Sequence, residues 1–151
     1  MKVLYTSMLL LHVLGVVVWV GGMFLMHVAV RPAAVELLQP PQRLPLMLQV
    51  MRRFFTVVIA SIVVLLATGG PLLMQVPGAQ APRGWHAMAG LGVLMVLVFG
   101  HIFFGPFRRA RAAVAAQDWP EGGRRMNQIA LLVKVNLAIG WIAIAAVLLW
   151  R

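Results

Sequence analysis

The chain alternates between four long apolar stretches and three links that hold most of its charged residues. The apolar stretches run from about residue 4 to 30, 54 to 76, 85 to 107 and 129 to 150. Each has the roughly 20 residues that an α-helix needs to cross a hydrocarbon core about 30 Å thick. Because backbone polar groups in lipid must find partners within their own segment, this pattern predicts four transmembrane helices.

Similar features recur in the two halves of the chain and suggest how the helices are arranged. Each half contains a span with two histidines, a basic link, and a second span preceded by an arginine pair. This repeat predicts a single domain over residues 1–151, all-α in class, forming an integral membrane four-helix bundle of up-down-up-down topology. Spans one and three would then run parallel.

Lysine and arginine are distributed unevenly between the two sides of the predicted bundle. The links after the first and third spans hold nine arginines, whereas the other side holds only Lys2, Arg83 and Arg151. Because cytoplasmic loops are enriched in basic residues, both termini are expected on the periplasmic side of a bacterial inner membrane. In the third link, Asp118 is followed three residues later by Glu121, which predicts a capped helix start.

Composition agrees with a lipid environment and narrows the chemistry. Hydrophobic residues make up 62% of the chain and charged residues 11%, whereas soluble proteins have roughly half and a quarter. The absence of cysteine excludes iron–sulfur clusters, thiolate haem ligation and cysteine-based zinc sites. Topology and anionic lipid account for the net charge of +10, so we expect the bilayer, and no nucleic acid, as a partner.

All four histidines lie in apolar stretches, at a spacing that occurs twice. His12 and His27 are 15 residues apart in the first span, and His86 and His101 are 15 residues apart in the third. Fifteen helical residues place two side chains roughly 22 Å apart along the axis and about 60° apart around it. With parallel spans, His12 would meet His86 and His27 would meet His101. Because polar groups in spans are costly and usually functional, we interpret all four as metal ligands.

Neighbouring residues favour a flat macrocycle over a bare ion. Gly15, Gly90 and Gly100 would let a ring approach the backbone closely, although small residues also serve helix packing. Arginine pairs at the cytoplasmic ends would suit haem propionates: Arg52, Arg53, Arg124 and Arg125. The residues therefore predict two haems b, each bound by two imidazoles, that carry electrons across or within the membrane. A quinone or a small oxidant such as superoxide would be the redox partner.

A family likeness is carried by Leu11-His12-Val13 and Trp19-Val20-Gly21-Gly22, with Trp85-His86 and Phe107-Arg108-Arg109 in the third span. These residues resemble the bacterial copper-resistance D (CopD) family, and the chain is also similar to HemJ-type membrane protoporphyrinogen oxidases. Both resemblances imply a four-helix bundle and support His12 and His86 as ligands. The inner histidines do not belong to the oxidase pattern, so the second haem depends on spacing alone.

The resemblances imply two alternative functions. One is copper transport or resistance, for which ten methionines supply soft ligands suited to Cu(I), although methionine also fills apolar spans. The other is porphyrinogen oxidation, with haem as the electron acceptor. All three acids lie in the links, so the spans carry no carboxylate dedicated to acid–base chemistry in that reaction. An enzyme and an electron relay both stay open, as does a homo-oligomer. Lys134, inside the last span, is expected to extend its ammonium group towards the surface.

Overall fold

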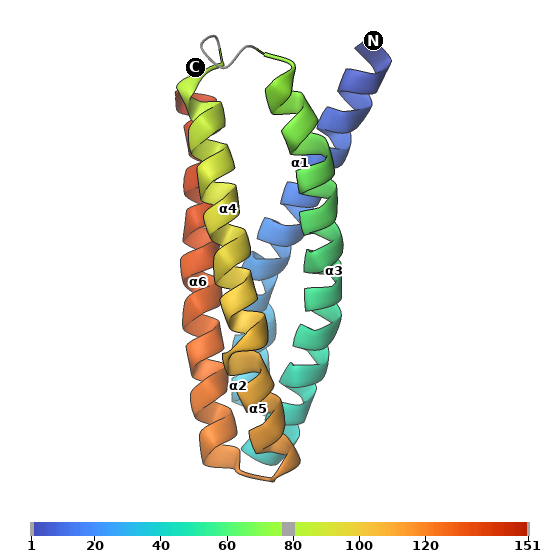
Figure 1. Cartoon of the computed structure of the whole chain (residues 1–151). Coiled ribbons are helices and arrows are strands. Elements are labelled where there is room, and N and C mark those ends of the chain that lie inside the picture. Colours follow the sequence, from blue (N-terminus) through green and yellow to red (C-terminus); the bar gives the residue numbers. More distant parts are fainter. Residues whose placement is uncertain (1, 77–80, 151) are drawn as a thin grey trace.

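Every element of the computed structural model is helical within the part of the chain that it describes, residues 2–76 and 81–150 (Figure 1). The predicted all-α class is therefore confirmed. The elements, in chain order, are α1 Lys2–Leu25, the π-helical turn η1 Met26–Val30, α2 Arg31–Leu37, α3 Pro40–Met74, α4 Arg83–Phe104, α5 Pro106–Ala115 and α6 Trp119–Leu149.

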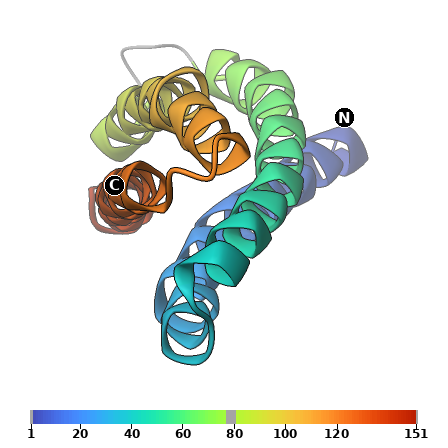
Figure 2. The ribbon, with the colours of Figure 1, turned by 90° about the horizontal axis from the view of Figure 1, so that it is seen from below.

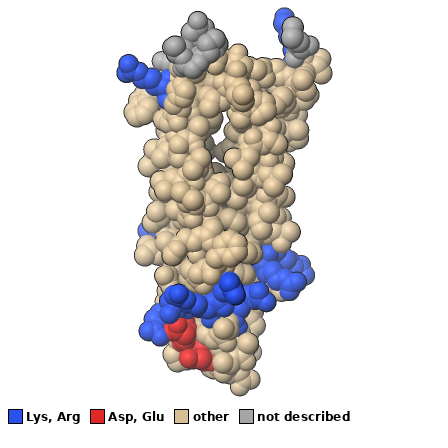
Figure 3. Space-filling view, in the orientation of Figure 1, with Lys and Arg blue, Asp and Glu red and all other residues tan. Residues whose placement is uncertain are grey.

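The helices form four long segments that run in alternate directions, so that both ends of the chain lie at one end of the bundle (Figure 1). The segments Lys2–Leu37, Pro40–Met74, Arg83–Ala115 and Trp119–Leu149 contain 36, 35, 33 and 31 residues, and each is apolar enough to cross a membrane. At 1.5 Å per residue they are roughly 45–55 Å long, which exceeds the hydrocarbon core. Lys and Arg side chains gather in a band near the end opposite the termini (Figure 3).

Two of the helices begin well before the stretches that hydrophobicity alone marks as spans. α3 begins at Pro40, fourteen residues before its apolar stretch, and α6 begins at Trp119, ten residues before its apolar stretch and directly after the cap predicted at Asp118. Prolines at the first positions of both helices cost no hydrogen bond, because those N–H groups have no intrahelical partner. The predicted cap at α6 is confirmed, since the Glu121 backbone N–H donates to Asp118 Oδ1 at 3.0 Å.

The bundle is built from two closely packed helix pairs, α1 with α3 and α4 with α6. Seen from below, the two helix pairs lie apart from each other (Figure 2). Glycine makes the second pair tight: a Cβ on Gly84 would lie 2.3 Å from the carbonyl oxygen of Ala146. The Gly84 N–H also donates to the Trp150 carbonyl at 3.0 Å, which ties the start of α4 to the end of α6.

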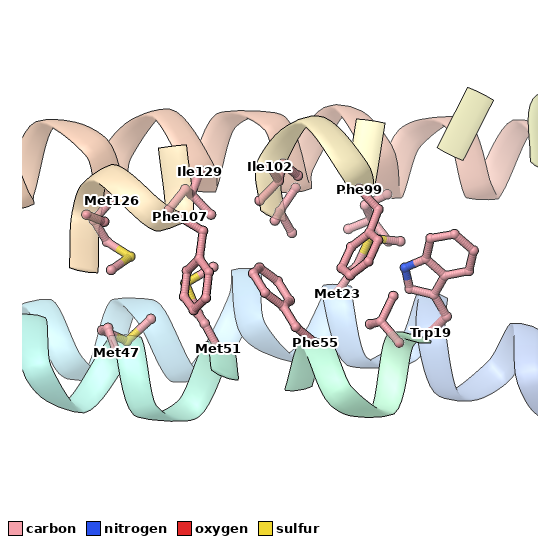
Figure 4. Packing of buried hydrophobic residues seen from close by; sticks show 14 of the residues in the cluster. Trp19, Met23, Met47, Met51, Phe55, Phe99, Ile102, Phe107, Met126 and Ile129 are labelled. Atoms are coloured by element: carbon pink, nitrogen blue, oxygen red, sulfur yellow. The ribbon is translucent and has the colours of Figure 1, made fainter. Parts of the chain in front are cut away.

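A hydrophobic core joins the two pairs in the half of the bundle away from the termini (Figure 4). Phe55 of α3 is its centre, with ring centroids 5.3 Å from Phe99 of α4 and 4.9 Å from Phe107 of α5. Trp19 of α1 closes the core with an edge-on contact to Phe99, at 6.4 Å between centroids. Towards the termini the pairs diverge, and Figure 3 shows an opening between them.

Candidate functional site

His12 lies on the buried side of α1, with its ring against α3. Its Nδ1 is 3.0 Å from the Thr68 hydroxyl oxygen, and that hydroxyl donates to the Val64 carbonyl at 2.7 Å. Because the Thr68 hydroxyl already donates to Val64, its oxygen is placed to accept from Nδ1–H of His12, and in that tautomer Nε2 is the nitrogen available to a metal. A histidine held in this way is the form that binds metals. A Cβ on Gly69 would lie 2.8 Å from His12 Cε1, so the imidazole rests on the α3 backbone.

His86 and His101 lie on the opposite kind of surface, the exposed stripe of α4. Both side chains are exposed, whereas Met95 and Ile102 are buried. At 100° per residue, the exposed stripe is centred about half a turn from the buried one. α4 therefore presents its two histidines outwards while α1 presents His12 inwards.

The structure does not bring together the two histidine pairs that the spacing predicts. The backbones of α1 and α4 do not approach closely in the described chain, because each helix packs mainly on a different partner; the two helices meet through the edge-on contact of Trp19 with Phe99. The facing of α4 is set by its contact with α6, where glycine and alanine permit close approach: Gly84, Gly140, Ala143 and Ala146 are all buried. Equal spacing makes two histidines share one side of a helix, but it does not decide which neighbour that side faces.

The glycines predicted to admit a macrocycle take up different roles. Gly15 is buried, and a Cβ there would lie 3.2 Å from Leu65 of α3, so its small size serves the α1–α3 contact. A Cβ on Gly90 or Gly100 would have no neighbour within 4 Å, which leaves both positions open.

The arginines predicted to bind propionates lie at the end opposite the termini, and two of them share a carboxylate. Glu121 accepts from Arg125 Nε at 2.7 Å and also from Arg124 Nη2. Arg125 donates further to Gln128 Oε1 at 3.2 Å. Arg52 and Arg53 are exposed on α3, and Lys134 is exposed on α6.

A small pocket beside His27 brings together residues that sequence patterns alone did not group. Its volume is about 30 Å³, which is room for one water molecule or one ion. We call it the methionine pocket. Its lining consists of Met26, His27, Arg31, Met47, Met51, Met126, Ile129, Ala130 and Val133.

A π-helical turn places Met26 and His27 at the pocket. The Arg31 backbone N–H donates to the Met26 carbonyl, which is the i to i+5 bond of a π-turn. Pro32 follows directly, and a proline lacks an N–H and crowds the carbonyl four residues earlier, so it favours a widened turn here. π-turns inside helices occur frequently at functional sites.

The methionines of α3 and α6 escaped the sequence interpretation because they lie outside the predicted spans. Met47 and Met51 precede residue 54, and Met126 precedes residue 129. A pattern that could have revealed them is present in α3, where Met47, Met51, Phe55 and Val58 recur at helical spacing and are all buried.

The donors in the methionine pocket favour a soft, monovalent metal ion. Thioether sulfur is a neutral, soft ligand that selects Cu(I), and imidazole also suits copper. Harder ions need carboxylates, and none lines the pocket. Across the described residues, no group of three or more His, Cys, Asp or Glu side chains is placed to hold a metal ion.

Comparison with known protein families supplies an independent line of information. Residues 48–150 match the family described as copper resistance protein D. The match covers α3 from Leu48 onwards, α4, α5 and α6. α1 and η1, with His12, Met26 and His27, lie outside it. Comparisons with curated proteins and with solved structures gave no match.

Proposed function

Because this chain belongs to the copper resistance protein D family, we propose that it carries copper across the membrane in which its four helices lie. The family match, over about two thirds of the chain, is the observation that carries the proposal. Copper is the cargo of this protein rather than a permanent cofactor. The sequence resemblance in the first span extends the same family likeness to His12.

Soft donors at several depths support passage through the bundle. His12 lies in the N-terminal half of α1, Met95 lies near the middle of α4, and the methionine pocket is lined by residues close to the arginine pairs in sequence. A cation in a low-dielectric interior must exchange its water for other ligands, because an unpaired buried charge is very costly. Neutral imidazole and thioether ligands can do this for Cu(I) without adding further charge to the interior.

We also propose the direction in which the protein is inserted. The band of Lys and Arg side chains away from the termini (Figure 3) supports an arginine-bearing end in the cytoplasm and both termini in the periplasm. Anionic lipid would pair with this band. The host membrane would be the inner membrane of a bacterium.

A haem b protein that transfers electrons is the second candidate, favoured by two observations. His12 is anchored through Nδ1, in the tautomer that leaves Nε2 available to a metal, and an opening lies between the helix pairs in the same half of the bundle (Figure 3). Two bis-histidine haems would also require α4 to turn its exposed stripe inwards by about half a turn. That rotation would remove Gly84 and Met95 from the buried side, where they now pack. A quinone, superoxide or porphyrinogen partner belongs to this candidate alone.

Copper and haem content of the purified protein separates the two candidates. The full-length chain, expressed in copper-supplemented cells and purified in mild detergent, is expected to retain copper and to show no reduced haem b absorption bands. Reduced haem b bands with two haems per chain, and no retained copper, would instead support the electron-transfer candidate. In that case His12→Ala should abolish one of the two haem signals.

A further inference from the structure

We propose that the methionine pocket is a binding site for a single Cu(I) ion, held by Met47, Met51 and Met126 together with Met26 and His27. This inference rests on the proposed function and deepens it, because it assigns the cargo ion, its oxidation state and the residues that hold it near the cytoplasmic end of the path.

Three of the thioethers converge from two different helices. Met47 and Met51 of α3 are 3% and 4% exposed, and Met126 of α6 is 6% exposed. Figure 4 shows the side chains of Met47 and Met126 directed towards each other across the space between their helices. All three methionines line the same small pocket. A cavity of about 30 Å³ accepts one ion and is too small for a larger ligand.

The charges around the pocket select a monovalent ion. Arg31 lines it with the apolar part of its side chain, and its guanidinium donates from Nη2 to Oδ1 of the exposed Asn127 at 2.9 Å, so this positive charge lies at the surface beside the pocket. No carboxylate in the lining offsets that charge. Because the Coulomb repulsion scales with the charge of the bound ion, a divalent ion is disfavoured twice as strongly as Cu(I). Ag(I), which is also soft and monovalent, should therefore bind in place of Cu(I), whereas Zn(II) should not.

The π-turn contributes the remaining two donors. It brings consecutive residues, Met26 and His27, to the same cavity. In a regular α-helix consecutive side chains diverge by about 100°, so a widened turn makes it easier for both to reach one cavity. The local irregularity of the first segment thus has a ligand-binding explanation as well as a cause in Pro32.

The position of the pocket fits the end of a transport path. Met51 is followed by Arg52 and Arg53, and Met126 is preceded by Arg124 and Arg125. Nearby positive charge weakens cation binding and so favours release. A soft site surrounded by arginines would hold Cu(I) long enough to collect it from the bilayer interior and still deliver it to an acceptor on that face.

The test is Cu(I) and Ag(I) binding to the full-length protein in detergent, measured by competition with a chromogenic Cu(I) chelator under reducing conditions. The variant carries Met47→Leu, Met51→Leu and Met126→Leu, because leucine nearly conserves volume and removes sulfur. The matched control carries Met23→Leu, at a methionine that is 2% exposed and lies outside the pocket lining. We expect the pocket variant to bind Cu(I) and Ag(I) at least about tenfold more weakly, with the control unchanged.

Equal Cu(I) affinity of the native protein and the pocket variant would overturn the site, as would an equal loss in the control. Thermal melting checks that each variant is folded. Should the triple variant not fold, Met126→Leu alone carries the prediction, and X-ray absorption of the Cu(I)-loaded native protein should show sulfur and nitrogen neighbours. Copper flux into vesicles tests the proposed function separately. If the native protein transports copper but the pocket variant binds Cu(I) as tightly as the native protein does, only the site is contradicted. If the native protein binds Cu(I) at the pocket but does not transport copper, only the transport proposal is contradicted.

Discussion

Replacing Phe55 with alanine is expected to lower the free energy of unfolding of the detergent-solubilised protein by about 3 kcal/mol, the low end for removing a large core aromatic. Phe55 is 2% exposed and its ring meets Phe99 of α4 and Phe107 of α5. These contacts cross between the two helix pairs, which elsewhere share few surfaces. The expected loss lies at the low end because lipid and detergent solvate apolar side chains, so mainly packing is lost.

Thermal unfolding followed by intrinsic tryptophan fluorescence measures the effect of Phe55→Ala. Phe104→Ala is the matched control, since it removes a phenyl ring that is 70% exposed and should leave the unfolding temperature nearly unchanged. Equal destabilisation by both substitutions would mean that the aromatic core does not join the pairs.

Gly84→Ala should be the most damaging of the single-methyl additions to the bundle. The new Cβ would lie 2.3 Å from the Ala146 carbonyl oxygen and 2.7 Å from that of Trp150. Both are backbone atoms, one in α6 and one in the residue that directly follows it, so relief requires a shift of the whole helix. Overpacking of this kind costs about 2 kcal/mol, and it would also strain the Gly84–Trp150 hydrogen bond.

Gly90→Ala supplies the control for this prediction within the same helix. A Cβ at Gly90 meets nothing within 4 Å, and alanine favours a helix by up to about 1 kcal/mol relative to glycine. The expected order of unfolding temperature is therefore Gly90→Ala at or above native, and Gly84→Ala well below it. A reversed order would show that α4 and α6 are not in the close contact described.

Hydrophobicity and the basic links predicted the helical class and the membrane-crossing segments because both depend on one-dimensional patterns. The Asp118–Glu121 cap was equally readable, since capping is local. The direction in which His86 and His101 face could not be predicted in this way, because it depends on which helix packs most closely against α4. Gly84 and the small residues of α6 decide that contact, and only three-dimensional packing reveals it.

The methionine pocket shows the other limit of the sequence. Its donors come from α3, α6 and the π-turn, and these three segments lie far apart in the sequence. Treating methionine as apolar filling was reasonable for each residue alone. That four methionines and a histidine line one pocket is a property of the fold. The predicted pairing of histidines and the observed clustering of methionines lead to different metals.

Copper uptake by sealed vesicles containing the purified full-length chain tests the transport proposal most directly. Cu(I) is supplied outside under reducing conditions, and an enclosed copper indicator reports its arrival. The proposal predicts that vesicles with the native chain, or with Gly90→Ala as a folded control, take up Cu(I) clearly faster than protein-free vesicles, while Zn(II) uptake is unchanged. Cu(I) uptake equal to that of protein-free vesicles, with folded protein in the membrane, would contradict the proposal.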